Sequence, residues 1–516
     1  MKRILKNIKT SLFGSIAGGS LILDGIQQNN WITIIAGIAA AIRMRMKGYE
    51  VHVVEANLYP GGKLTAFSLG GFRFDAGPSL FTLPELVDEL ILLCGKKPEN
   101  YLTYKRCEIV CNYFYEDGTR FSFFSDPTKR SEELITKLKL DPALVEAHLK
   151  RSRFSYEATK NTFLEKSLHR WKTYFSPGIL KTIAAIPRLN LNKTMHEVNE
   201  KHLKHPKLIQ LFDRYATYNG SNPYVAPGIL TLIPHLEANL GAYYPTNGMH
   251  QITTGLVDLA NDIGVQFRFG RRVDEICVDK NGVNGVRIGS EVFSADLVFC
   301  NSDVKPAYKY LLPNLKKPSK ILAQEPSSSA LIFYWGISQQ FPELDLHSIF
   351  FSADYKKEFS EIFEKNTLPE DPTVYINVSA KKSISDAPNG SENWFVMINV
   401  PANKGQDWNF LRLKARRIII DKISRLLGVQ IEPLIVVEDY LDPIRIETRT
   451  SSAGGALYGT SSNDRMAAFF RHPNFSTVKG LFFIGGSVHP GGGIPLCLYS
   501  AKIATDLVPQ VKKEGH

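Results

Sequence analysis

The stretch WITIIAGIAAAIRMRMKGYEVHVVEAN, which runs from Trp31 to Asn57, has the order of elements expected at the start of a dinucleotide-binding unit. Apolar residues at helical spacing between Ile38 and Met46 lead to Gly48. A short strand rich in valine follows and ends on Glu55. In such a unit, an acid at the end of the second strand accepts hydrogen bonds from ribose hydroxyl groups. The stretch therefore predicts an α/β fold that holds a nucleotide.

Two glycine-containing turns follow this unit. YPGGKL carries Gly61 and Gly62, which allow backbone N–H groups to approach a phosphate, and Lys63 adds a positive charge. FDAGPSLF adds a further tight turn at Gly77. Both turns are expected near the nucleotide.

A third glycine-rich connection lies near the C-terminus. Residues 480–508 read GLFFIGGSVHPGGGIPLCLYSAKIATDLV, which predicts a strand, a loop and a helix that starts near Pro495. Five glycines, at positions 485, 486, 491, 492 and 493, lie in the loop. A helix N-terminus offers free N–H groups and partial positive charge, which stabilise negative charge on a reduced flavin ring. A plain connection rarely needs five glycines, so we interpret this loop as part of a cofactor site.

Composition narrows the class of protein. The chain has 516 residues, 44% of them hydrophobic, and a net charge of +11, which favours anionic partners. Because no dense Lys/Arg block is present, we expect a membrane surface rather than a nucleic acid. No apolar run reaches the length of a spanning helix, and the six cysteines have neither CxxC nor zinc-site spacing. We therefore expect a cytoplasmic protein, peripheral to the membrane, with no metal.

One segment has the composition of a membrane-facing helix. Residues 163–190 read FLEKSLHRWKTYFSPGILKTIAAIPRLN and mix basic residues with Trp171, Tyr174, Phe175 and several Leu and Ile residues. An amphipathic helix that lies in the membrane interface has this character. The alternative is a set of ordinary helices with a solvated basic face.

Four stretches together resemble the carotenoid (phytoene) desaturase family of FAD-dependent oxidoreductases: EANLYPGGKL, FRFDAGPSLF, RYATYNGSNPY and GGSVHPGGGIPLCLYSAKIA. Within that family, RYATYNGSNPY and SSALIFYWGI are most similar to the 1-hydroxycarotenoid 3,4-desaturase type. The resemblance runs from about Ala36 to the C-terminus. It implies a Rossmann-like FAD-binding domain interleaved with a helical and antiparallel-sheet substrate domain.

The resemblance also implies roles for individual residues. Gly37 is the third glycine of the dinucleotide motif, Glu55 holds the adenosine ribose, and the backbone of Val273 pairs with the adenine end. The turn residues face the pyrophosphate and ribitol, and the terminal loop surrounds the flavin; these are Gly61, Gly62, Lys63, Gly77, Gly485, Gly486, Gly493, Ile494 and Pro495. No catalytic side chain is assigned.

The domain boundaries follow from the alternation of nucleotide-type units with insertions. We assign residues 36–125, 245–305 and 445–516 to the FAD-binding domain. Residues 126–244 and 306–444 are assigned to the substrate and membrane-facing domain, and residues 1–35 to an atypical N-terminal extension.

The N-terminal turn departs from the family pattern. Alignment of AGIAAAIR places the first two motif glycines on Ile32 and Ile34. Isoleucine is stiff and avoids positive φ, so this turn predicts weakened FAD binding. The alternative is that WITII still forms the first strand and leads into a distorted turn.

The activity implied is removal of hydrogen from a carotenoid, such as phytoene or a 1-hydroxycarotenoid, to an acceptor that the sequence does not identify. Two alternatives stay open: a carotenoid cis-trans isomerase of the same family, and a flavin-free lipid carrier on the same fold. An amine oxidase is disfavoured, because no aromatic cage or covalent-flavin cysteine is recognisable.

Overall fold

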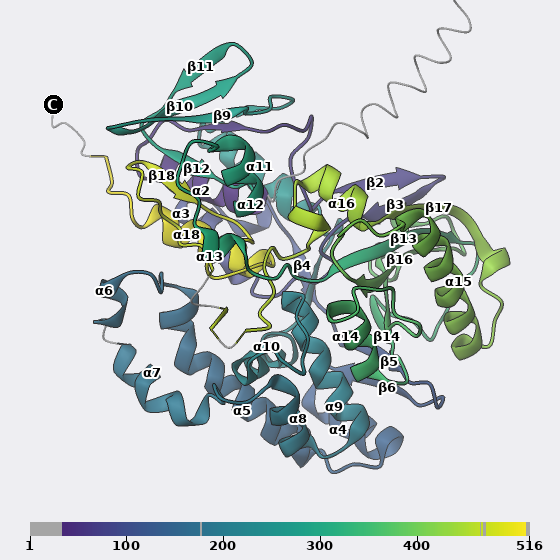
Figure 1. Ribbon diagram of the computed structural model, residues 1–516. Helices are drawn as coiled ribbons and strands as arrows, with labels where there is room; N and C mark the ends of the chain where they lie inside the picture. The colour runs from purple at the N-terminus through teal and green to yellow at the C-terminus, as the bar shows by residue number, and fades with distance from the viewer. Residues whose placement is uncertain (1–33, 176–177, 465, 468–470, 512–516) are drawn as a thin grey trace, which may run out of the picture.

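The computed structural model describes residues 34–175, 178–464, 466–467 and 471–511. Ile32 and the first three residues of WITII, the stretch considered as a first strand over residues 31–35, lie outside this part of the chain. The described elements form three groups: a parallel-strand region with its helices, a large sheet, and a helical lobe (Figure 1).

The parallel-strand region consists of two pairs of short strands. β1 (His52–Val54) pairs with β8 (Gln266–Arg268), and β12 (Val298–Cys300) pairs with β18 (Leu481–Phe483). Helix α2 (Ile34–Met46) packs on both β1 and β12, so it joins the two pairs. It is almost wholly apolar, and most of its side chains from Ile35 onward are buried.

Three further helices surround α2. They are α3 (Glu85–Leu93), α11 (Gln251–Asp262) and α18 (Ile494–Thr505). A three-stranded antiparallel sheet, at the top of Figure 1, lies beside this region; its strands are β9 (Glu275–Asp279), β10 (Gly282–Ile288) and β11 (Glu291–Ser294).

The second region is built on a seven-stranded sheet. Its order is β17 (Ile435–Leu441), β13 (Ser329–Ile337), β16 (Glu392–Val400), β15 (Val374–Val378), β14 (His347–Phe350), β5 (Ile109–Phe114) and β6 (Arg120–Phe124). Neighbouring strands are antiparallel except β14 and β5.

Both faces of this sheet are covered, which explains the continuous apolar run of β13. All nine residues of that strand are buried. Leu331, Phe333 and Trp335 pack against α15 (Trp408–Leu427). Alternate residues, among them Ile332 and Tyr334, point to the opposite face, where the hairpin β2–β3 (Ala66–Leu69 and Phe72–Asp75) packs.

The helical lobe lies at the bottom of Figure 1 and takes up most of residues 127–213. Its helices are α4 (Pro127–Leu138), α5 (Ala143–Thr159), α6 (Trp171–Tyr174), α7 (Ile179–Ala185), α8 (Met195–Leu203) and α9 (Pro206–Asp213). The remaining short elements are β4 (Tyr104–Arg106), β7 (Tyr243–Pro245), α10 (Ile233–His235), α12 (Val304–Pro306), α13 (Ser319–Leu322), α14 (Tyr355–Phe363) and α16 (Pro443–Thr450).

The predicted α/β fold with a sheet-containing second region is confirmed, with two differences in detail. Helix α2 begins at Ile34 rather than at Ile38, so Ile34 and Ile35 are helical and do not extend a first strand. Strands β5 and β6 belong to the large sheet, although the sequence assigned residues 36–125 to the FAD-binding part. Within the described residues, no helix is both long and apolar enough to cross a membrane.

Candidate active site

Three residues lie just after the carboxyl ends of the parallel strands, and two of them were predicted to bind the cofactor. Glu55 directly follows β1, Asn301 directly follows β12, and Gly485 follows β18. A Cβ atom at Gly37 would lie 3.5 Å from Asn301 Nδ2, and one at Gly485 would lie 2.7 Å from Asn301 Oδ1. Open α/β sheets bind ligands at this edge, outside the carboxyl ends of the strands.

Glu55 is a buried carboxylate that accepts hydrogen bonds from the residues directly after it. This residue is 3% exposed, and its Oε1 accepts hydrogen bonds of 2.8 Å from both the backbone and the side-chain nitrogen of Asn57. Desolvation by burial raises the pKa of Glu55 to about 7, although these donors lower it. The loop after β8 reaches the same place, because Arg271 N donates to Glu55 O at 2.9 Å. Val273, two residues further along that loop, is half-buried.

The two turns after Glu55 lie against each other. A Cβ atom at Gly77 would stand 1.6 Å from the carbonyl oxygen of Lys63, and one at Gly61 would stand 2.3 Å from that of Leu64. Gly61 has φ +121°, which favours glycine. Lys63 Nζ donates to the carbonyl oxygen of Leu457 at 3.2 Å.

The terminal loop places backbone next to open space. Gly486 faces Gly492, because a Cβ atom on Gly486 would lie 3.3 Å from Gly492 Cα. Gly493 has φ +105°, and a Cβ atom added there would meet no described neighbour within 4 Å. Gly493 is the N-cap of α18, and Pro495 occupies its first turn, as the sequence predicted.

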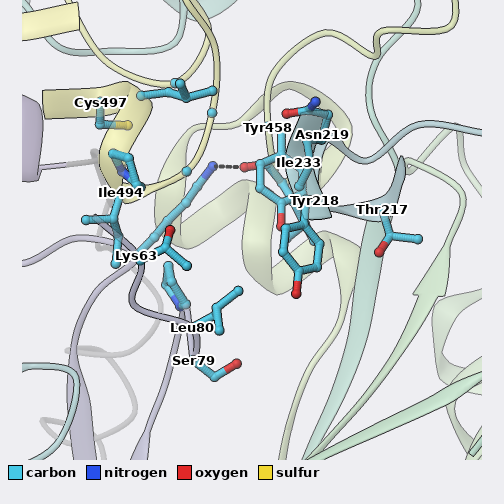
Figure 2. A pocket seen from close by; sticks show the side chains of 18 of the residues that line it. Lys63, Ser79, Leu80, Thr217, Tyr218, Asn219, Ile233, Tyr458, Ile494 and Cys497 are labelled. Carbon is cyan, nitrogen blue, oxygen red and sulfur yellow. Dashed lines mark hydrogen bonds between the residues drawn. The ribbon is translucent and has the colours of Figure 1, made fainter. Parts of the chain in front are cut away.

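These segments share one large cavity of about 510 Å³. Figure 2 shows Lys63, Ile494 and Cys497 on one side of it and Thr217, Tyr218 and Asn219 on the other. The far wall is largely apolar and aromatic, with side chains from the helical lobe and the large sheet that include Phe163, Leu164, Ile233, Ile332, Tyr334, Phe395 and Met397.

The cavity contains most of the predicted site residues but not all. Those that line it are Gly61, Gly62, Lys63, Gly77, Gly486, Gly493, Ile494 and Pro495. Gly37 and Gly485 lie behind this wall at Asn301, and Glu55 and Val273 lie in the segments that follow β1 and β8.

Sequence reasoning missed a buried polar cluster in the cavity wall. Arg214 Nη2 donates to Glu237 Oε1 at 3.2 Å and to Tyr113 OH at 2.9 Å, and Arg214 Nη1 donates to Tyr218 OH at 3.0 Å. His347 also lines the cavity and is 3% exposed. The only sequence signal was a single arginine at the start of the otherwise uncharged stretch RYATYNGSNPY.

The chain's own groups fit a flavin dinucleotide. Glu55 accepts hydrogen bonds from the two residues that follow it, and ribose hydroxyl groups would donate further ones to this carboxylate. The guanidinium of Arg471 lines the cavity, is 3% exposed and has its Nη1 without a hydrogen-bond partner among the described residues; burial lowers the pKa of this group to about 10. Polar ring atoms of a flavin would satisfy such a donor. The α18 N-terminus adds partial positive charge beside it.

Comparison with known proteins decides the family. Residues 35–509 match the family described as flavin containing amine oxidoreductase. The chain belongs to this family. Its use of FAD and its predicted character as an FAD-dependent oxidoreductase are confirmed.

Similar curated proteins point to the carotenoid branch that the sequence predicted. A 1-hydroxycarotenoid 3,4-desaturase of Flavobacterium sp. (strain P99-3) is 52% identical over 92% of this chain and 97% of its own length. A 4,4'-diaponeurosporene oxygenase of Staphylococcus aureus (strain MSSA476) is 31% identical over 92% of this chain and 96% of its own length.

Solved structures support the fold alone. Putrescine oxidase bound to putrescine has a TM-score of 0.60 at 14% identity, over 92% of this chain and 96% of its own. An oxidoreductase from Methanosarcina mazei has a TM-score of 0.59 at 14% identity, over 92% of this chain and 97% of its own.

Proposed function

We propose that this flavoprotein desaturates a carotenoid that carries a hydroxyl group near one end. The observation that carries the proposal is a cavity that joins two different walls. One wall, which we call the cofactor wall, is made of the glycine turns at Gly61, Gly77, Gly486 and Gly493, and the other is apolar. A polyene needs such an apolar space to hold its hydrocarbon chain. The similarity to a 1-hydroxycarotenoid 3,4-desaturase supports the substrate class.

The flavin, when bound, supplies the acceptor for hydride from the substrate C–H bond. The chain's own residues orient the polyene and exclude water from it. Ile332, Tyr334 and Phe395 are buried and form part of the apolar wall from adjacent strands of a rigid sheet. The α18 N-terminus beside Ile494 stabilises negative charge that develops at the cofactor wall.

Product analysis tests the activity and separates the alternatives. The purified holoprotein is incubated with a 1-hydroxylated polyene in detergent, with dissolved oxygen or a quinone as acceptor. A desaturase yields a product that has lost two hydrogens and absorbs at longer wavelength. An isomerase yields a product of unchanged mass with an altered cis-trans pattern. A carrier returns the polyene unchanged, which would contradict the proposal.

We also propose that the helical lobe docks on an anionic bilayer. Around α6 and α7, large apolar side chains are exposed: Trp171 by 81%, Phe175 by 81% and Leu180 by 74%. Leu191 is 42% exposed and also lines the cavity, so the cavity approaches the surface at this patch. Basic side chains accompany the patch and suit anionic headgroups; they include Lys172, Lys181 and Arg188.

Flotation with phosphatidylglycerol-containing vesicles tests this surface. Trp171→Ala combined with Lys172→Glu is expected to release most of the protein from the vesicles. The matched control, Phe410→Ala with Lys414→Glu, alters an exposed apolar and basic pair on α15, on the opposite side of the molecule (Figure 1). Equal flotation of both double variants would contradict the proposed surface.

A further inference from the structure

The polar cluster in the apolar cavity requires an explanation. Arg214 is 7% exposed and Glu237 is 2% exposed, and both line the cavity. A buried ion pair is a weak source of stability, because the charges lose their hydration. A wall made only to enclose a hydrocarbon would use apolar side chains there. We call Arg214, Tyr218, Glu237 and His347 the polar recess.

Two polar atoms of the recess have no partner within the described part of the chain. Arg214 Nε and His347 Nε2 are both buried and make no hydrogen bond there. Both residues line the same cavity, and Arg214 is near enough to lower the pKa of His347 further. Leaving buried polar atoms unpaired is costly, so these two atoms point to a polar group of the ligand.

The recess lies close to the cofactor wall. Ser79 follows Gly77 by two residues, and its Oγ atom lies 2.7 Å from the hydroxyl oxygen of Tyr375. The same Tyr375 hydroxyl is 2.7 Å from His347 Nδ1. This chain of hydrogen bonds runs from the turn at Gly77 to the imidazole of His347, and all three linked residues line the cavity.

We propose that the polar recess binds the hydroxyl group of the carotenoid end and thereby selects hydroxylated over unhydroxylated polyenes. The inference rests on the proposed function. The hydroxyl oxygen accepts from Arg214 Nε–H, while His347 Nε2 donates to the hydroxyl or accepts from it, depending on the tautomer. An unhydroxylated end leaves both atoms unpaired in an apolar cavity.

Bond connectivity agrees with this placement. In a 1-hydroxycarotenoid, the hydroxyl group on C1 is only a few bonds from the C3–C4 bond. Its binding site must therefore lie beside the flavin rather than at the distant end of the cavity. The Ser79–Tyr375–His347 chain has this position. Burial also lowers the pKa of His347 to about 3, so its imidazole is neutral and suited to a neutral hydroxyl.

The test compares binding of a 1-hydroxylated polyene and its unhydroxylated parent to the holoprotein, by quenching of intrinsic fluorescence. The wild-type chain is expected to bind the hydroxylated polyene at least about tenfold more tightly. His347→Leu and, separately, Arg214→Lys are expected to bring this ratio close to one. The matched control is His148→Leu, which removes an equally buried histidine that does not line the cavity and is expected to keep the wild-type ratio.

The inference would be overturned if both recess variants kept the wild-type ratio of affinities for the two polyenes. This includes the case in which both affinities fall by the same factor. Hydrogen loss from the polyene is measured on the same samples. A preference that disappears in the variants, without any desaturation in the wild type, would support the recess and contradict the desaturase function. Desaturation of both polyenes without any preference would contradict the recess alone.

Discussion

The two walls of the cavity are built in different ways. The cofactor wall consists of backbone turns at Gly61, Gly77, Gly486 and Gly493, where a side chain would collide or would fill the cavity. The substrate wall consists of side chains from strands and helices far apart in the sequence. A wall made of backbone tolerates few substitutions at its glycines. A wall made of side chains can change shape through single substitutions that leave the backbone in place.

The strongest test of this contrast is Gly77→Ala. Its Cβ would fall 1.6 Å from the carbonyl oxygen of Lys63, a backbone atom that only a shift of the turn can move. We expect complete loss of bound flavin, measured from the visible spectrum of the purified chain. Gly178→Ala is the control, because its nearest neighbour atom would be 3.9 Å away. Stoichiometric flavin in Gly77→Ala would refute the description of a rigid backbone wall.

Glu55→Gln is expected to have the next largest effect. A charged acceptor for ribose hydroxyl groups contributes about 1.5–3 kcal/mol per hydrogen bond, so FAD affinity should fall about 10- to 100-fold. The measurement is the dissociation constant of FAD for the deflavinated protein. An unaltered affinity of Glu55→Gln for FAD would contradict a ribose bound at the end of β1.

The same carboxyl gives a pH dependence to the stability of the flavin-free chain. Its folded pKa, about 7, lies above the ordinary value of 4.5, so the folded state holds the proton more tightly. This contribution is complete below pH 4.5 and is lost as the pH rises through about 7, by up to about 3 kcal/mol. Urea unfolding over this range should show a fall in wild-type stability that Glu55→Gln removes. Parallel profiles for the two proteins would be inconsistent with a buried carboxyl of raised pKa.

The smallest effect is expected from repair of the N-terminal turn, Ile32→Gly with Ile34→Gly. If isoleucine at these positions hinders the approach of the pyrophosphate, the repair should tighten FAD binding by up to about tenfold. Equilibrium titration with FAD measures it. An unchanged dissociation constant would show that the turn accommodates isoleucine. It would also show that this part of the cofactor site tolerates side chains in place of glycine.

Motifs in the sequence predicted glycine turns that the structure places in the cavity wall, because the requirements of such turns are local. Positive φ and close backbone contact demand glycine at fixed spacing, as at Gly61 and Gly493. The apolar sequence of β13, whose nine residues are all buried, agrees with its place in the interior of the large sheet, between β17 and β16.

The polar recess was not predictable in the same way. Arg214, Glu237 and His347 come from separate elements, and nothing in their sequence spacing indicates that they meet. Strands β5 and β6 illustrate the same limit, because only the pairing of β5 with β14 places them in the large sheet. Contacts of this kind depend on the pairing of segments that lie far apart in the sequence, so local patterns do not predict them.

The most direct test of the account is a single turnover without oxygen. The holoprotein is mixed with an excess of the 1-hydroxylated polyene, and flavin reduction and polyene mass are followed together. Desaturation in this cavity predicts one polyene that has lost two hydrogens for each flavin reduced. A flavin that stays oxidised, with a polyene of unchanged mass, would contradict the claim that this cavity brings a flavin against a carotenoid for desaturation.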